Sequence, residues 1–235
     1  LGAVHSDYAR ARATLHTANT FRTQPGVFGE GWREALAAAV RVARASVPGG
    51  HRVAGSIAPL ADCYRPDLSP GEGARESHRR VARALREEGC DVLLCETFAN
   101  ELEALAAAEE AVRTGLPVWL SLTPGPFGDL LTPEELLTVG ERAVSTGIER
   151  LLVNCVAASR AQPYVEALSA VPLPFGVYAN AGARAEALGW EATGAEAVDA
   201  YAAHAQGWVD AGASVVGGCC GTRPLHIEAL AARVG

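Results

Sequence analysis

Short apolar runs along this chain alternate with longer segments in which apolar residues recur at helical spacing. Runs rich in Val, Ile, Leu and Phe are typical of buried strands, and the intervening segments are typical of amphipathic helices. We predict strands at 13–21, 52–57, 91–97, 117–122, 150–155, 175–180 and 214–216. We predict the end of a helix at 1–12, and helices at 32–45, 76–87, 101–112, 132–147, 162–168, 195–210 and from Pro224 onward.

Regular alternation of strands and helices favours a parallel sheet covered by helices. Seven strand–helix units fit an α/β (β/α)8 TIM-type barrel whose first strand is missing or unrecognised better than a doubly wound sheet. No linker or break in composition divides the chain, so residues 1–235 are expected to form a single domain. Neither a P-loop nor a G-x-G-x-x-G motif stands between a strand and a helix, which argues against a nucleotide site.

Composition narrows the chemistry. The formal net charge is −7, so we expect small-molecule substrates and no affinity for nucleic acid or membranes. All 20 basic residues are Arg, which excludes catalysis through a Lys Schiff base. Six cysteines without a dense framework predict a reducing compartment, the cytoplasm, and a metal or catalytic use of the thiols.

Two adjacent cysteines near the C-terminus, Cys219 and Cys220, are flanked by glycines. Neighbouring side chains on a regular strand point to opposite faces, so both thiols face one point only if the chain turns sharply there. We expect a metal held by both sulfurs, with Cys155 at the end of another strand as the best third ligand. Burial as small apolar side chains, or a disulfide between the adjacent pair, are the alternatives.

The carboxyl ends of the strands form the active site in barrels of this kind. Here those ends carry polar residues and three thiols, a donor set that suits Zn²⁺ with one position left open. An open position would favour a substrate thiol, which zinc holds as the nucleophilic thiolate. We expect Cys63, Cys90 and Cys95 to be bystanders, although Cys63 lies in a loop that could approach.

Several segments together resemble the homocysteine S-methyltransferase family. They span nearly the whole chain in the right order, and the Gly-Gly-Cys-Cys-Gly motif combined with Asn154-Cys155 is the most specific. The matching segments are 17–21, 54–59, 96–98, 153–155, 178–182 and 217–222. The resemblance implies a (β/α)8 barrel, zinc on the three cysteines, homocysteine as acceptor and a sulfonium or quaternary ammonium methyl donor.

The resemblance also implies roles for individual residues. Glu96 would bind the amino group of homocysteine and orient its sulfur for attack. The other residues expected to line the substrate site are Asn19, Thr20, Ser56 and Asn180. The expected reaction moves a methyl group from S-methylmethionine or S-adenosylmethionine to the homocysteine thiolate, giving methionine.

Two features depart from the family pattern. Its first strand carries an Asp-Gly-Gly-rich loop that nothing here matches, and Arg12 stands where a Gly often precedes the second strand. If that position needs a positive φ, Arg costs about 1 kcal/mol. The first departure keeps open a catalytically inactive zinc-binding or thiol-sensing barrel. A different zinc barrel enzyme would be favoured by His and Asp at the strand ends, which are not found there.

Overall fold

The parallel sheet expected from the sequence is present in the computed structural model, which describes residues 1–181 and 194–235. Seven strands follow one another in chain order, and every neighbouring pair is parallel. They are β1 (Leu15–Ala18), β2 (Arg52–Ile57), β3 (Val92–Phe98), β4 (Val118–Leu122), β5 (Arg150–Ala157), β6 (Phe175–Asn180) and β7 (Val215–Gly218).

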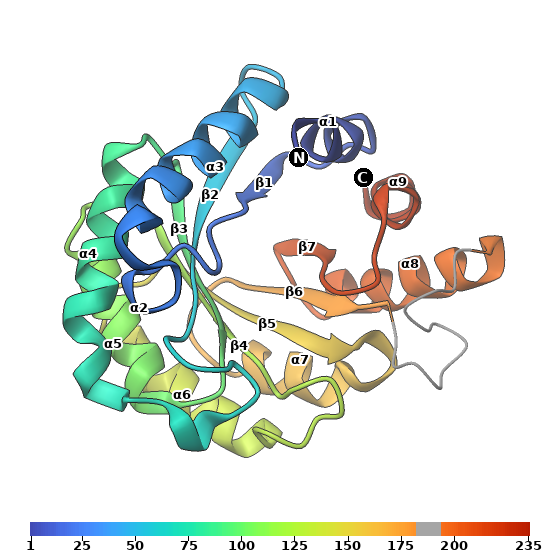
Figure 1. Ribbon diagram of the computed structural model, residues 1–235. Coiled ribbons are helices and arrows are strands. Elements are labelled where there is room, and N and C mark those ends of the chain that lie inside the picture. The colour runs from blue at the N-terminus through green and yellow to red at the C-terminus, as the bar shows by residue number, and fades with distance from the viewer. Residues whose placement is uncertain (182–193) are drawn as a thin grey trace.

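Helices pack on the outer side of the curled sheet (Figure 1). They are α1 (Gly2–Arg10), α2 (Pro25–Phe28), α3 (Trp32–Ser46), α4 (Arg75–Glu87), α5 (Glu101–Val112), α6 (Pro133–Val144), α7 (Gln162–Ser169), α8 (Ala195–Asp210) and α9 (Pro224–Val234). Short 3₁₀ turns occur at Gly29–Gly31, Pro66–Leu68, Gly71–Ala74 and Ala158–Arg160. The start of α6 shows how the sequence sets such boundaries. The hydroxyl of Thr132 accepts from the N–H of Glu135, whose carboxylate accepts in return from the N–H of Thr132.

The sheet curls like a barrel but does not close within the described residues, where β1 and β7 are its two edge strands. Helices α1 and α9 lie side by side across the open side (Figure 1). This arrangement confirms the expected (β/α)8-type architecture with one strand lacking.

Alternate side chains of each strand point to opposite faces, so the sheet has two apolar layers. The outer layer packs under the helices through buried strand residues such as Leu93, Leu120 and Leu151. The inner layer fills the concave side with Ala54, Val92, Leu94, Trp119 and Leu152. Both layers support the carboxyl ends of the strands, where the polar residues gather.

Some boundaries differ from expectation. Strand β1 is shorter than 13–21 because Thr20 leaves the ladder and donates its hydroxyl to the carbonyl of Ser56. Strand β5 continues to Ala157. Helix α2 was not expected; it begins at Pro25, whose fixed φ suits a first helical turn. None of the helices in the described part of the chain is long and apolar enough to cross a membrane.

Candidate metal centre and substrate site

The three expected metal ligands come together at the carboxyl ends of β5 and β7. The Sγ atoms of Cys155 and Cys219 are 3.0 Å apart, and those of Cys219 and Cys220 are 4.0 Å apart. All three sulfurs lie within 4.8 Å of one another, and the described residues contain no other such group of three His, Cys, Asp or Glu ligands. The remaining thiols lie outside this cluster, at Cys63, Cys90 and Cys95.

A bulge in β5 aims Cys155 at its partners. The pairing with β6 shifts register between Asn154 and Ala157, and Cys155 has a φ of +56°. A residue other than Gly in this conformation is strained by about 1–3 kcal/mol. Contacts around Cys155 maintain this strained conformation, which directs its sulfur toward the other two cysteines. Bulges often redirect side chains in this way beside functional sites.

The chain turns sharply after β7, as the glycines predicted. A Cβ on Gly218 would lie 2.7 Å from the Cβ of Thr222, so only Gly fits there. The hydroxyl of Thr222 donates to the carbonyl of Cys219 at 2.6 Å and closes the turn. The side-chain oxygen of Asn180 accepts from the N–H of Cys220 at 3.1 Å. Strand β6 therefore fixes the position of the second adjacent cysteine.

The sulfur positions fit a metal of zinc's size. A tetrahedral site with Zn–S bonds of about 2.3 Å places sulfurs about 3.8 Å apart. The Cys219–Cys220 separation is close to that value, and the sulfurs of Cys155 and Cys219 would have to move apart by about 0.8 Å.

Hydrogen bonds around the sulfurs favour a thiolate. Thiol hydrogen bonds from Cys155 and Cys219 lower the pKa of Cys220. Hydrogen bonds with Cys155 and Cys220, together with burial, raise the pKa of Cys219. Cys155 Sγ also accepts from the side-chain N–H of Asn154 at 3.4 Å. The three sulfurs together form a soft donor set of the kind that zinc prefers.

Glu96 lies at a second bulge, at the end of β3. The register with β4 shifts between Cys95 and Phe98, and Thr97 has a φ of +65°. The hydroxyl of Ser56 donates to Glu96 Oε1 at 2.5 Å, and that of Tyr178 donates to Oε2 at 3.0 Å. Burial raises the pKa of Glu96, although these two hydrogen bonds partly oppose the rise. The two hydrogen bonds fix the position of the carboxylate, and a cationic partner would stabilise its ionised form.

Asn154 connects the two bulges. Its side-chain oxygen accepts from the hydroxyl of Ser121 at 2.8 Å, and its N–H₂ group donates to Thr97 Oγ1 at 2.8 Å and to Cys155. The side chains of Ser121, Thr97 and Asn154 are buried. Such partners orient metal ligands and tune their charge.

Thr20, Ser56 and Asn180, which were also expected to line the substrate site, lie around this centre. Thr20 is buried, and its hydroxyl accepts from the N–H of Ser56 at 2.9 Å, which ties β1 to β2. Ser56 reaches Glu96, Asn180 reaches Cys220, and Asn19 is exposed just beyond β1. Their contact with substrate stays a prediction. The last residue of the 178–182 motif lies outside the described residues.

Sequence reasoning assigned no role to the side chains of Ser121 and Tyr178. A signal was available for both, because they are polar side chains within strands that are mostly apolar.

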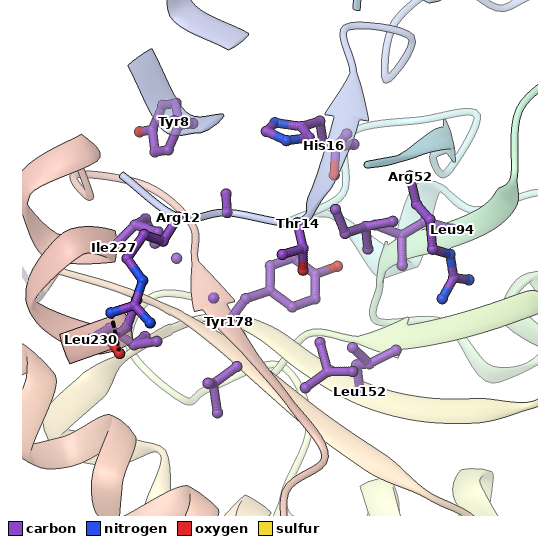
Figure 2. Close-up of a pocket in the computed structure, with 18 of the residues that line it drawn as sticks. Tyr8, Arg12, Thr14, His16, Arg52, Leu94, Leu152, Tyr178, Ile227 and Leu230 are labelled. Carbon is purple, nitrogen blue, oxygen red and sulfur yellow. Dashed lines mark hydrogen bonds between the residues drawn. The ribbon is translucent and has the colours of Figure 1, made fainter. Parts of the chain in front are cut away.

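A cavity of about 660 Å³ lies beneath this centre, on the open side of the sheet. Figure 2 shows Tyr178 between the residues of β1 and those of α9, with its ring against the cavity. Its hydroxyl reaches Glu96, so this ring separates the cavity from the carboxylate. The walls include Gly217 and Gly218 but none of the three cysteines. The open side of the sheet therefore reaches close to the strand that presents two of the sulfurs.

Comparison with known proteins identifies the same family that the sequence motifs resemble. The sequence profile of the family described as Homocysteine S-methyltransferase matches residues 1–234. Homocysteine S-methyltransferase from Escherichia coli is 33% identical over 266 aligned positions, which cover 98% of this chain and 83% of that protein. Selenocysteine Se-methyltransferase from Brassica oleracea is 33% identical over 181 positions, covering 72% of this chain and 50% of that protein.

Solved structures support the same family. The metallated form of the homocysteine methyltransferase MmuM from E. coli superposes with a TM-score of 0.80 at 28% identity, covering 99% of this chain and 83% of that one. 3-Hexulose-6-phosphate synthase, at 14% identity and a TM-score of 0.57, shares the fold alone. The chain spans about half the length of the plant relatives that it matches, with 50% of the Brassica protein and 48% of an Arabidopsis thaliana homocysteine S-methyltransferase aligned. By its profile match, its relatives and its three-cysteine centre, this chain belongs to the homocysteine S-methyltransferase family.

Proposed function

We propose that this chain is a zinc-dependent methyltransferase that moves a methyl group from a sulfonium donor to the thiolate of homocysteine. The observation that carries the proposal is the cluster of three sulfurs within 4.8 Å, supplied by Cys155, Cys219 and Cys220 at the carboxyl ends of two strands. Three protein thiolates leave one position of a tetrahedral zinc site for a substrate sulfur. Zinc bound there would act as a Lewis acid that keeps a substrate thiol ionised near neutral pH.

The protein's own residues orient the acceptor. Glu96 binds the ammonium group of homocysteine, because its buried carboxylate is fixed by Ser56 and Tyr178 and meets no basic side chain among its hydrogen-bond partners in the described residues. A cationic partner would repay the burial that raises the pKa of this carboxyl. Two fixed points, the sulfur at the cysteines and the ammonium at Glu96, set the direction of the sulfur lone pair.

The reaction balances without an added oxidant or base. The sulfur of homocysteine attacks the donor methyl carbon, the new S–CH₃ bond forms, and the old bond breaks with its electron pair going to the donor sulfur. The positive sulfonium becomes a neutral thioether, the homocysteine thiol proton passes to solvent, and methionine is released. S-methylmethionine and S-adenosylmethionine are the proposed donors.

Metal content and acceptor binding test the proposal together. We expect about one zinc per purified chain, retained by the parent protein and lost in Cys219→Ser. X-ray absorption of the zinc should show a fourth sulfur when homocysteine is added. Methionine formation from each sulfonium donor is then measured, with selenocysteine as a second acceptor because one relative is named for it. Absence of zinc from the parent protein would refute the mechanism.

The alternative is a zinc-binding or thiol-sensing barrel without turnover. The open side of the sheet, between β1 and β7, favours this second candidate. Zinc and homocysteine binding with no methionine formed from either donor would support it. We further propose that residues 1–235 act as one domain in the cytoplasm. The six cysteines are all unpaired, which fits a reducing compartment.

A further inference from the structure

The cavity beneath the metal centre is basic, although the chain as a whole is acidic. Arg12, Arg52 and Arg150 line it, and no Asp or Glu does so among the described residues. The formal net charge of the chain is −7, from 27 acidic and 20 basic residues. Figure 2 shows Arg12 beside Leu230 and Arg52 beside Leu94, across the cavity from each other. Positive charge therefore lines two sides of this cavity.

None of these three arginines forms an ion pair with the described residues. Arg12 donates to the backbone carbonyl of Ala231 at 3.1 Å, and Arg150 donates to the hydroxyl of Ser214 at 2.7 Å. Both acceptors are neutral. The side chain of Arg52 makes no hydrogen bond within the described part of the chain. Three guanidinium charges thus line one cavity with no carboxylate in contact with them.

Two of these arginines contact the same aromatic ring. Arg52 begins β2 and Arg150 begins β5, so both lie at the amino ends of the strands, away from the cysteines. Each guanidinium carbon lies 5.3 Å from the centre of the Trp119 ring. The negative face of an indole attracts a guanidinium placed over it. Trp119 is buried in the inner layer of the sheet, and its ring therefore holds two groups of the same charge beside the cavity.

Buried nitrogens around this cavity lack hydrogen-bond partners. The described residues contain four such side-chain atoms, and three belong to residues that line the cavity: Trp119 Nε1, Arg150 Nε and His5 Nε2. The indole and guanidinium nitrogens can only donate, so the group that they lack is an acceptor. A buried donor without an acceptor is unfavourable. Because the side chain of Arg52 is exposed and flexible, it can swing aside and admit an acceptor to these donors.

The remaining walls of the cavity are largely apolar. They include Leu15, Leu94, Leu152, Val215, Ile227 and Leu230. The volume of about 660 Å³ lies in the range of sites that hold small organic ligands. The lining includes neither the three cysteines nor any of the residues expected to bind homocysteine. The cavity is therefore separate from the proposed metal and substrate sites.

We propose that this cavity is a second ligand site, which binds an organic carboxylate with an apolar body. Arg52 and Arg150 hold the carboxylate, because planar guanidinium groups suit its two oxygens. The N–H of Trp119 also donates to it, and the apolar walls contact the carbon chain. Such a ligand satisfies the orphaned donors and neutralises the clustered positive charge. The site needs no metal, so this inference does not depend on the zinc-binding role proposed above.

Titration calorimetry of the purified protein with octanoate tests the proposal. Octanoate carries one carboxylate on an apolar chain, and 1-octanol is the matched neutral molecule. We expect one octanoate per chain, bound at least about 10-fold more tightly than 1-octanol, because hydrogen bonds between charged groups are stronger than neutral ones. Octanoate should also change the fluorescence of Trp119, and Trp119→Phe should abolish that change. Absence of octanoate binding, or equal affinity for octanoate and 1-octanol, overturns the proposal.

Variants of the arginines locate the carboxylate. Arg52→Gln and Arg150→Gln should each weaken octanoate binding by about 10-fold and leave the affinity for 1-octanol unchanged. Arg80→Gln is the matched control, because Arg80 lies over the ring of Trp32, at 5.4 Å, and outside the cavity. It should bind octanoate as the parent does; equal weakening would show that only the overall charge matters and would overturn the site. Excess homocysteine should not displace octanoate, and displacement would contradict a separate site.

Discussion

Replacing Asn154 by Ala should be among the most damaging single changes at the site, although Asn154 is not itself a metal ligand. The side chain is completely buried and makes hydrogen bonds of 2.8 Å to both Ser121 and Thr97. Each such bond contributes about 1 kcal/mol, and the void left by the amide adds to the loss. We expect the free energy of unfolding to fall by about 2–4 kcal/mol. For a chain of this size that corresponds to a drop in Tm of about 4–16 °C.

Urea unfolding of the reduced, metal-free protein measures this cost without interference from zinc. Ser121→Ala and the double variant complete the test, because either single change breaks the same hydrogen bond between Ser121 and Asn154. The two costs should therefore not add, and we expect a coupling energy of about 0.5–1 kcal/mol. A cost below about 1 kcal/mol for Asn154→Ala, or strictly additive costs, would refute the view that this amide holds the two bulges together.

Three further predictions concern strain and charge. Burial raises the pKa of Glu96, so the stability contributed by its neutral form is lost as the pH rises through that pKa. Glu96→Gln should thus unfold at a higher urea concentration than the parent at alkaline pH, and at a similar urea concentration at acid pH. Homocysteine binding, measured by calorimetry, should be lost in this variant. Gly218→Ala places a methyl group 2.7 Å from the Cβ of Thr222; urea unfolding should show a cost of about 1–3 kcal/mol, and the zinc content should fall. Arg12→Gly relieves a φ of +74° and should raise the free energy of unfolding by about 1 kcal/mol; no gain would contradict the strain.

Much of the fold could be predicted because periodicity reports burial directly. The helices at 101–112 and 195–210 and the strand at 175–180 have their expected ends. Their apolar positions recur at one period, and their flanks carry capping residues or glycines. Cys95 also behaves as expected, since it packs in the outer layer and is not part of the three-cysteine cluster.

Arg12, which stands where a Gly often precedes the second strand, does have a positive φ, of +74°. The same conformation at Thr97 and Cys155 could not be predicted, because neither is a residue type that favours it. Both residues are held there by the buried amide of Asn154 and by bulges that depend on neighbouring strands. Sequence patterns identify which residues belong to the site, whereas tertiary contacts decide where their side chains point.

The course of the loop between β2 and α4, which includes Tyr64, lies beyond sequence reasoning for a different reason. The loop contains only short 3₁₀ turns, so no periodicity relates its residues to the sheet. A single carboxylate, that of Glu103 on a helix later in the chain, sets its course. Loop contacts of this kind depend on individual hydrogen bonds, which composition and spacing do not encode.

The placement of the sulfurs also bears on how this protein keeps its shape. Cys155 and Cys219 are 64 residues apart in sequence, and they span β6 to join β5 to a strand that has only one neighbour in the described sheet. A metal shared by them is a reversible cross-link that closes a long loop at the weakest edge of the sheet. Its binding energy becomes folding energy for that edge. Metal supply would then control the lifetime of the folded chain, with amide exchange in β7 slowing as the site fills.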